Sequence, residues 1–208
     1  MIGNEAEARA YVAGLCDDAA LARLDTLVDA LERENQVQNL VAKATLPIVW
    51  QRHIADSAQL LQFCDAKCPW LDLGSGAGFP GLVIAAMRPN LPVILVESRK
   101  RRVEWLEEAA SSIGILNCRV LGDRLEVLES FGAGVISARA FAPLDRLLAL
   151  SARFSTKDTR WVLPKGRSAA QEVEALPKKH RQMFHVEQSL TDPDAGIVVG
   201  RGQWSGRA

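Results

Sequence analysis

Apolar residues beyond position 70 occur in short β-rich runs that are separated by segments with helical spacing. This alternation predicts βαβ units, and therefore an α/β domain built on a parallel sheet. The last two runs are joined by a polar turn over 192–196, which predicts a hairpin and an antiparallel strand at one edge. The expected strands are 70–74, 92–97, 117–121, 135–137, 160–163, 183–190 and 196–202, and the expected helical segments are 79–88, 99–113, 124–128, 143–152 and 168–176.

Before these runs the pattern is helical. Asp17-Asp18 can cap a helix whose apolar side chains recur at helical spacing, at Leu21, Leu24, Leu27, Val28 and Leu31. A second helix is predicted to begin at Pro47, because proline suits a first helical turn, and to reach Leu61. We therefore predict an N-terminal helical cap over 1–66, packed on a main domain over 67–208.

Composition allows one ordinary domain with a small helical appendage, because 208 residues with 48% apolar content can bury a full core. Residues 1–10 alternate acids with small residues and contain no apolar run long enough for a signal peptide or a membrane span. We expect a soluble, cytoplasmic protein with no membrane partner.

The cysteines give no sign of a metal site. Cys16, Cys64, Cys68 and Cys118 are scattered, and the three histidines add no recognisable ligand spacing. Metal sites need more ligands at regular spacing. We expect reduced structural thiols and no metal.

Charge is balanced overall but not along the chain. Residues 1–138 carry 13 Lys and Arg against 18 Asp and Glu, whereas residues 139–208 carry 12 against 7. The basic C-terminal third predicts that an anionic macromolecule can approach one side of the molecule. A solvated basic face without a partner is the alternative.

The segment 70–81 leads an apolar strand into a glycine loop and then into a helical segment. Gly74, Gly76 and Gly78 occupy alternate positions, where the lack of a Cβ lets the backbone turn sharply and approach a ligand. This pattern is typical of a nucleotide-type cofactor site. A dinucleotide fingerprint instead spaces its glycines G-x-G-x-x-G and usually lies on the first strand of its domain.

Two carboxylates narrow the choice of cofactor. Asp72 stands two places before the first glycine, where it can fix the loop and lie near a cationic ligand, so a sulfonium suits the site better than a pyrophosphate. Glu97 ends the second strand, where it can accept both ribose hydroxyls of an adenosine. Glu97 alone fits NAD and S-adenosylmethionine equally, and a surface acid that caps the next helix is the alternative.

Separate motifs follow one another along most of the chain. They are Asn39-Leu40, Arg52-His53-Ile54-Ala55-Asp56-Ser57, the loop 71–81, Arg124-Leu125-Glu126, Ser137-Ala138-Arg139-Ala140-Phe141-Ala142 and Leu163-Pro164-Lys165-Gly166. In this order they resemble the bacterial small-subunit ribosomal RNA methyltransferase G family, also called glucose-inhibited division protein B. The chain departs from that family's pattern at Glu97, where aspartate is frequent, and at Ala138, which interrupts a serine-arginine pair.

The resemblance implies a class I methyltransferase fold with a Rossmann-like sheet, S-adenosylmethionine as cofactor, and methylation of N7 of one guanine in a 16S ribosomal RNA loop near the decoding site. The implied partner is 16S ribosomal RNA or a small ribosomal subunit particle, not DNA. By motif, Gly74 and Phe79 line the methionine side of the cofactor, Leu125 and Glu126 flank its adenine, and Arg139 borders the cofactor and the substrate entrance.

The residues agree with this chemistry. Guanine N7 has a lone pair and no proton, so transfer from a sulfonium needs alignment and no general acid or base. Residues 140–143 replace the Asn/Asp-Pro-Pro-aromatic loop common in amine methylation, and no cysteine follows Cys118 to serve pyrimidine C5 chemistry. Phe141 is predicted either to stack on an extruded base or to be a core residue at the strand end.

Arg139, Lys165 and Arg167 follow the fourth and fifth predicted strands and are the candidate phosphate contacts. His53 is grouped with these RNA-side residues as an orienting or structural hydrogen-bonding residue, since N7 transfer gives a proton acceptor no task. The basic runs 99–102 and 178–181 are interpreted mainly as solvated helix positions, with one or two residues of the first able to reach RNA.

Three other functions are considered. A small-molecule methyltransferase keeps the cofactor, but the basic C-terminal third argues against it. An NAD(P)-dependent oxidoreductase predicts NAD(P)H binding and no affinity for S-adenosylhomocysteine. An RNA-binding module that senses the cofactor predicts no turnover.

Overall fold

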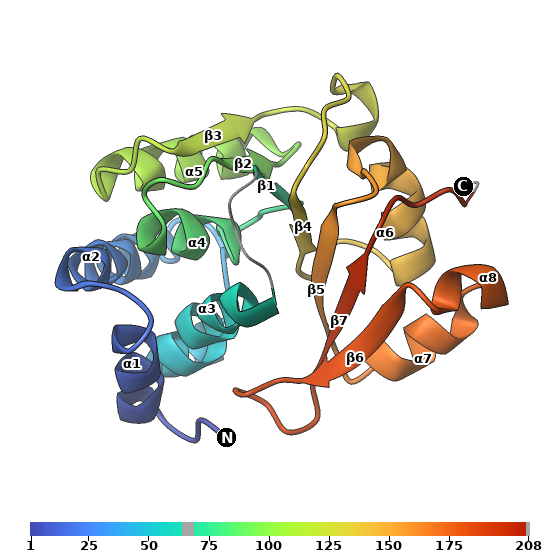
Figure 1. Cartoon of the computed structure of the whole chain (residues 1–208). Helices are drawn as coiled ribbons and strands as arrows, with labels where there is room; N and C mark the ends of the chain where they lie inside the picture. Colours follow the sequence, from blue (N-terminus) through green and yellow to red (C-terminus); the bar gives the residue numbers. More distant parts are fainter. Residues whose placement is uncertain (64–68, 207–208) are drawn as a thin grey trace.

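The computed structural model describes residues 1–63 and 69–206 and has a seven-stranded sheet at its centre (Figure 1). The strand order is β3-β2-β1-β4-β5-β7-β6. Strands β1 to β5 pair in parallel, which confirms the predicted βαβ units. The strands are β1 (Trp70–Leu73), β2 (Val93–Val96), β3 (Cys118–Leu121), β4 (Val135–Ala138), β5 (Arg160–Gly166), β6 (Phe184–Gln188) and β7 (Gly196–Arg201).

Helices cover both faces of this sheet. The helices α4 (Gly81–Met87) and α5 (Lys100–Ser112) pack on one face, and α6 (Leu144–Ser151) and α7 (Ala169–Ala175) pack on the other (Figure 1). All four residues of β1 are buried as a result, with Trp70 in one apolar cluster and Leu71 and Leu73 in the other. Short helices α8 (Lys178–Arg181), η4 (Leu125–Val127) and η5 (Ala152–Phe154) lie in the connections.

The antiparallel strand is β7, the last in sequence, but it does not lie at the edge of the sheet as predicted. It pairs antiparallel with β5 on one side and with β6 on the other, so β6 takes the edge. Burial explains this order, because Ile197, Val198 and Val199 of β7 are all buried, whereas β6 has exposed residues along most of its length. A strand that is apolar on both faces is better placed inside a sheet than at its edge.

The N-terminal cap contains more helix than the sequence pattern indicated. Helix α1 (Glu5–Ala13) was not predicted, and Asn4 caps it by accepting a hydrogen bond from the Glu7 amide. Helix α2 (Asp18–Glu34) begins after Asp17, which caps it as predicted. The helical segment expected from Pro47 begins earlier and is irregular: it consists of η1 (Lys43–Ile48), the π-helical η2 (Trp50–Ala55), α3 (Asp56–Ala58) and η3 (Gln59–Phe63).

A contact between distant residues holds the start of η2. The Glu5 carboxylate accepts hydrogen bonds from the amides of Trp50 at 3.0 Å and Gln51 at 2.8 Å. These amides begin η2, so α1 supplies the partners that the start of a helix needs. The sequence pattern around Pro47 contains no information about this contact.

The cap and the sheet share one hydrophobic core. Leu24 and Leu27 of α2 and Ile54 of η2 belong to the same buried cluster as Leu82 of α4 and Leu106 of α5. The predicted boundary at 66/67 lies outside the described residues, as do Cys64 and Cys68, so the division into two domains stays a prediction. Within 1–63 and 69–206, no helix is long and apolar enough to cross a membrane, and no cluster of metal-ligating side chains occurs.

Candidate functional site

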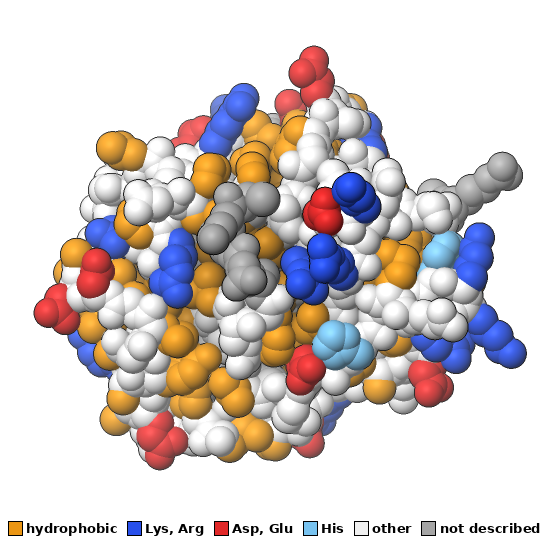
Figure 2. Space-filling model, in the orientation of Figure 1, with side chains coloured by type: hydrophobic (Ala, Val, Ile, Leu, Met, Phe, Trp, Pro, Cys, Tyr) orange, Lys and Arg blue, Asp and Glu red, His pale blue; other side chains and the backbone are white. Residues whose placement is uncertain are grey.

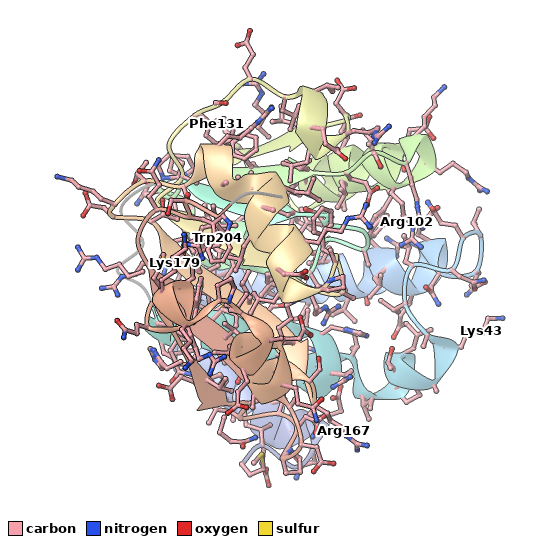
Figure 3. The ribbon with its side chains drawn as sticks, turned by 90° about the vertical axis from the view of Figure 1, so that its right-hand side faces the viewer. Lys43, Arg102, Phe131, Arg167, Lys179 and Trp204 are labelled. Atoms are coloured by element: carbon pink, nitrogen blue, oxygen red, sulfur yellow. The ribbon has the colours of Figure 1, made fainter. Side chains whose placement is uncertain are left out.

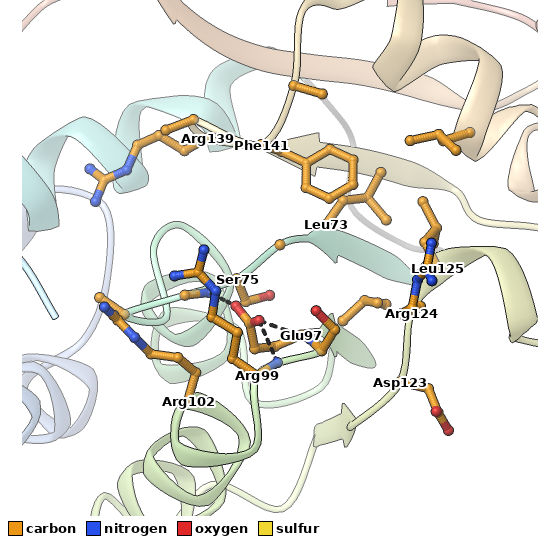
Figure 4. Close-up of a pocket in the computed structure, with 18 of the residues that line it drawn as sticks. Leu73, Ser75, Glu97, Arg99, Arg102, Asp123, Arg124, Leu125, Arg139 and Phe141 are labelled. Atoms are coloured by element: carbon orange, nitrogen blue, oxygen red, sulfur yellow. Dashed lines mark hydrogen bonds between the residues drawn. The ribbon is translucent and has the colours of Figure 1, made fainter. Parts of the chain in front are cut away.

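Two adjacent cavities are lined by residues at the carboxyl ends of the parallel strands. The glycine-loop cavity has a volume of about 560 Å³ and is lined by the loop after β1, by Glu97 after β2 and by residues 123–126 after β3 (Figure 4). The turn cavity has a volume of about 650 Å³ and is lined by residues 164–166 at the end of β5 and by parts of the turn between β6 and β7. Residues 139–143, here called the dividing wall, line both cavities.

The glycine loop has the backbone that its sequence predicts. Gly74, Gly76 and Gly78 have φ angles of +62°, +54° and +98°, which side chains rarely adopt. A Cβ on Gly74 would lie 2.4 Å from the ring of Phe141, and one on Gly78 would lie 2.3 Å from Leu82. A Cβ on Gly76 would meet nothing closer than 3.7 Å, so this position leaves clearance at the cavity. The glycines therefore shape the loop, as predicted.

Asp72 holds the glycine loop in place from its buried side. It is fully buried, and its carboxylate accepts hydrogen bonds from the Ser137 hydroxyl at 2.7 Å and from the Gly81 amide at 3.3 Å. Trp70 in turn donates to the Ser137 oxygen at 2.8 Å. Burial raises the pKa of Asp72 to about 6, against which these hydrogen bonds act. The predicted role in fixing the loop is confirmed, since Asp72 ties β1 to β4 and to the start of α4.

Glu97 lies at the floor of the glycine-loop cavity and is only 9% exposed. One carboxylate oxygen accepts from the amides of Ser98 at 2.8 Å and Arg99 at 2.9 Å, and the other accepts from Gly76 at 3.1 Å (Figure 4). Glu97 therefore bonds the two amides that precede α5 but does not cap the first turn of that helix, and it is not a surface acid. A carboxylate has about four acceptor positions, so one is left for a ligand in the cavity.

Arg139 stands at the junction of the two cavities. Its guanidinium donates to His53 Nδ1 at 3.1 Å, forms an ion pair with Asp56 at 3.4 Å and lies over the ring of Phe79 at 5.1 Å. The side chain is 23% exposed, so these partners hold it while leaving one side accessible. Asp56 also accepts from Thr191 at 2.8 Å, which links the cap to the turn between β6 and β7.

His53 orients Arg139 from behind. The ring is buried and stacks on Phe79 with a centroid separation of 5.0 Å. Its Nε2 lies 2.8 Å from the Thr45 hydroxyl, which itself donates to the Ala42 carbonyl, so Nε2 carries the proton and Nδ1 accepts from Arg139. Burial, reinforced by the charge of Arg139, lowers the pKa of His53 to about 3 and keeps the ring neutral. The orienting role expected of His53 agrees with this position, whereas its burial counts against direct contact with RNA.

Lys165 is hydrogen-bonded to the dividing wall and forms an ion pair. Its side chain is 8% exposed, and the ammonium lies 2.9 Å from Glu172 and 2.6 Å from the Ala142 carbonyl oxygen. Within the wall, Ala140 has a φ of +53°, a conformation that costs an alanine free energy. Phe141 is half-buried and packs on Gly74, so it lines the cavities while also closing the core.

Two of the other predicted residues line a cavity, whereas Arg167 follows the lining residue Gly166 and lines neither. Leu125 and Glu126 line the glycine-loop cavity, and Glu126 pairs with Arg124 at 3.2 Å. Arg167 is 80% exposed and pairs with Asp194 at 2.7 Å. That Lys165 and Arg167 contact phosphates stays a prediction, and the ion pair that each makes counts against it.

Some lining residues were not predicted as part of the site. Leu40, Arg99, Arg102 and Arg146 all line the glycine-loop cavity. Arg102 holds the cap in place by donating to the carbonyls of Asn39 and Leu40. The basic run 99–102 could have indicated Arg99 and Arg102 as neighbours in the site, because positions three apart lie on one side of a helix. Leu40 belongs to the Asn39-Leu40 motif of the resemblance, which assigned it no role, and Arg146 lies in ordinary helical sequence and gave no signal.

Comparison with known proteins identifies one family. Residues 20–194 match the family described as rRNA small subunit methyltransferase G. The chain is 61% identical over 204 residues to the ribosomal RNA small subunit methyltransferase G of Erythrobacter litoralis (strain HTCC2594), which covers 98% of this chain and 99% of that protein.

Solved structures of low sequence identity share the fold. The mitomycin 7-O-methyltransferase MmcR has a TM-score of 0.57 at 17% identity, with 85% of this chain and 61% of that chain covered. A mutant of MtNAS in complex with S-adenosylmethionine has a TM-score of 0.55 at 14% identity, with 86% and 72% covered. The fold is that of the class I methyltransferases, as the resemblance implied.

Proposed function

The chain belongs to the ribosomal RNA small subunit methyltransferase G family, and from this we propose that it methylates N7 of a guanine in 16S ribosomal RNA by direct transfer from S-adenosylmethionine. The methyl donor of this class of enzyme is S-adenosylmethionine. The acceptor position and the absence of a general base are the parts that we propose. The observation that carries the proposal is the pair of cavities that share the dividing wall.

The glycine-loop cavity fits the donor. Gly76 leaves clearance for a ligand close to the backbone, and the buried Glu97 carboxylate keeps an acceptor position for the ribose hydroxyls. Leu125 and Glu126 line the same cavity beyond Glu97, where the adenine would lie, and Gly74 and Phe79 line the end nearer Arg139. When bound there, the cofactor supplies an electrophilic methyl group on a sulfonium.

The turn cavity would receive the target base. It shares Arg139 and Phe141 with the glycine-loop cavity, so a guanine at the junction of the two cavities would lie next to the donor. Phe141 can stack on a base, a contact worth roughly 1 to 3 kcal/mol. Arg139 is held by His53 and Asp56 with one side accessible, which suits contact with the RNA at this entrance.

The chemistry that these residues provide is alignment. Both nitrogens of His53 are engaged, Nδ1 by Arg139 and Nε2 by Thr45, so this ring has no free lone pair to act as a base. Asp72 is buried beneath the loop and bonded to Ser137 and Gly81. N7 transfer releases no proton from the acceptor nitrogen, and approximation with orientation can lower the barrier by about 7 to 11 kcal/mol.

The test is a map of N7-methylguanine in small-subunit RNA. Unmodified RNA and small-subunit particles are incubated with S-adenosylmethionine and either the wild-type protein or the Arg139→Ala variant. One new N7-methylguanine is expected with the wild-type protein and much less with the variant. A map that does not change contradicts the proposal. Activity should also fall steeply with salt, because binding to phosphates releases counterions.

A further inference from the structure

Some of the cations in and beside the two cavities already form an ion pair with a carboxylate, and others do not. Arg52, Arg139, Lys165 and Arg167 each have a carboxylate oxygen within 4.0 Å, at Asp192, Asp56, Glu172 and Asp194 respectively. Arg124 is likewise paired with Glu126. A phosphate that approaches one of these cations must displace, or be repelled by, the carboxylate already there.

Three cations of the glycine-loop cavity form no ion pair within the described residues. One of them, Arg102, uses its guanidinium to bond the carbonyls of Asn39 and Leu40, which leaves Arg99 and Arg146. Both are exposed and line the glycine-loop cavity, and in residues 1–63 and 69–206 neither guanidinium forms an ion pair or a side-chain hydrogen bond. They come from different elements: Arg99 immediately precedes α5, and Arg146 lies in α6 just beyond the dividing wall. Figure 4 shows Arg99 on the opposite side of the cavity from Phe141.

We propose that Arg99 and Arg146 are phosphate contacts of the substrate RNA at the mouth of the glycine-loop cavity. Each guanidinium offers donors in a planar fork that matches a phosphate, and neither has to break an ion pair to use them. Both line the same cavity as Arg139, so they are available to the backbone of a strand whose base lies beside Arg139. The inference rests on the proposed function, because it takes the RNA to be the substrate.

Arg99 also lies beside Glu97, so contact with the cofactor is the competing role. The two roles differ in a measurable way. A phosphate contact contributes to the salt dependence of RNA affinity, whereas a cofactor contact contributes to the affinity for S-adenosylhomocysteine without changing that dependence.

The experiment measures RNA affinity against salt concentration. Binding of a small-subunit RNA fragment that contains the methylated guanine is followed with the protein saturated by S-adenosylhomocysteine. The slope of log K against log salt should decrease in magnitude by about 0.7 to 0.9 for Arg99→Ala and for Arg146→Ala, and by about twice that in the double variant. Affinity for S-adenosylhomocysteine, measured by calorimetry, should stay within about twofold of wild type.

Two variants serve as controls. Lys157→Ala removes an exposed cation that precedes β5 and therefore lies at the amino ends of the strands, away from both cavities, and its slope should equal that of wild type. Arg167→Ala removes a cation at the carboxyl ends that Asp194 compensates, and the slope should change less than for Arg146→Ala.

Unchanged slopes for Arg99→Ala and Arg146→Ala would overturn the inference, as would a tenfold loss of S-adenosylhomocysteine affinity without a change of slope. Either result leaves the proposed function standing if the wild-type protein still produces N7-methylguanine. Failure of the wild-type protein to methylate the RNA would instead contradict the proposed function itself.

Discussion

Arg139 owes its position to a histidine that stays uncharged. A protonated His53 would carry donors on both nitrogens and could not accept from the Arg139 guanidinium. Burial on Phe79 and the nearby positive charge favour the neutral ring, and the Thr45 hydroxyl fixes which nitrogen is protonated. His53 is therefore a positioning residue, because it acts through Arg139.

Replacing His53 should harm catalysis less than replacing Arg139. In the His53→Ala variant Arg139 keeps Asp56 and the Arg52 carbonyl but loses the shortest of its three hydrogen bonds, and a shift of about 1 Å in a substrate-positioning group can cost on the order of a hundredfold in rate. His53→Asn should recover part of kcat/KM, because the amide oxygen can replace Nδ1 as acceptor. Methyl transfer to small-subunit RNA measures all three variants, and a greater loss in His53→Ala than in Arg139→Ala would overturn this assignment of roles.

His53 should also make stability depend on pH. Its pKa falls from 6.5 to about 3 on folding, so the unfolded chain binds the additional proton between these values. The stabilisation is complete above pH 6.5 and is lost as pH falls towards 3, by up to about 1.4 kcal/mol per pH unit. Urea unfolding at pH 7.5 and at pH 5.5 should show a loss larger by about 1 kcal/mol in wild type than in His53→Asn.

The comparison between variants is needed because Asp72 acts in the opposite direction. Its pKa of about 6 in the folded protein lies above the ordinary 3.8 of an aspartate, so its contribution to stability decreases as pH rises through this range. Asp72 is present in both proteins, and its effect cancels in the difference. The same pH dependence in wild type and His53→Asn would show that His53 is not held neutral.

Local sequence predicted only some of the site residues. The glycines and Glu97 could be identified because their spacing from the first strand is set by the βαβ unit itself. The compensation of Lys165 by Glu172, of Arg167 by Asp194 and of Arg139 by Asp56 could not, since the partners are brought together by the tertiary fold. A positive charge in sequence therefore does not establish a free positive charge in space.

At the level of elements, the loop between β1 and α4 has glycine at three positions for two different reasons. Gly74 and Gly78 are required by packing against Phe141 and Leu82, whereas Gly76 has open space around it. Gly76 is therefore the position at which the effect on a ligand can be separated from the effect on the fold.

Gly76→Ala should lose affinity for S-adenosylhomocysteine by more than its loss of stability explains. The appropriate control is Gly114→Ala, since Gly114 has a similar φ of +68°, lies after α5 and has nothing within 4 Å of an added Cβ, while Gly76 has only an ordinary contact at 3.7 Å. Both variants should lose about 1 to 2 kcal/mol of unfolding free energy from the left-handed backbone. Calorimetry should show weaker binding for Gly76→Ala only, and equal binding by the two variants would mean that the loop does not approach the cofactor.

The elements with regular patterns were predicted well, and the missing ones have physical explanations. The strands and α4 to α7 could be predicted from the spacing of their apolar residues, because each must bury a continuous apolar side. Helix α1 buries only Ala8 and Val12, too few positions to produce a clear period. The π-helical turn at Trp50–Ala55 depends on Glu5, and the position of β7 inside the sheet depends on its pairing with β5.

At the scale of the whole molecule, the cap is part of the core that supports the site. Leu27 of α2 is fully buried in the cluster that also contains Leu82 and Leu106, next to the glycine loop and α5. The cap also supplies His53 and Asp56 to Arg139. The site is thus built from both ends of the sequence.

Leu27→Ala should therefore destabilise the entire protein. A loss of about 2 to 5 kcal/mol is expected for a buried leucine, and tryptophan fluorescence and circular dichroism should report one coincident transition. Leu116→Ala is the control, because Leu116 is fully exposed and should change stability by no more than about 0.5 kcal/mol. Two separate transitions in Leu27→Ala would show that the cap unfolds independently.

The charge asymmetry along the sequence does not become a single basic face. Figure 3 shows Arg102 and Arg167 on one side of the molecule and Lys179 on the other, and Figure 2 shows acidic side chains among the basic ones. Several C-terminal cations are neutralised locally, including Lys165, Arg167 and Arg201. The cavity mouths, rather than the C-terminal third as a whole, are where RNA affinity should be sought.

The strained peptide at Ala140 has a consequence for energetics. Because the dividing wall borders both cavities, a ligand that relaxes Ala140 in one of them alters the wall of the other. By linkage the effect is reciprocal. If the bound nucleoside changes the affinity for RNA by some factor, bound RNA changes the affinity for the nucleoside by the same factor. Donor and acceptor then form one thermodynamic cycle, in which any coupling through the dividing wall acts equally in both directions.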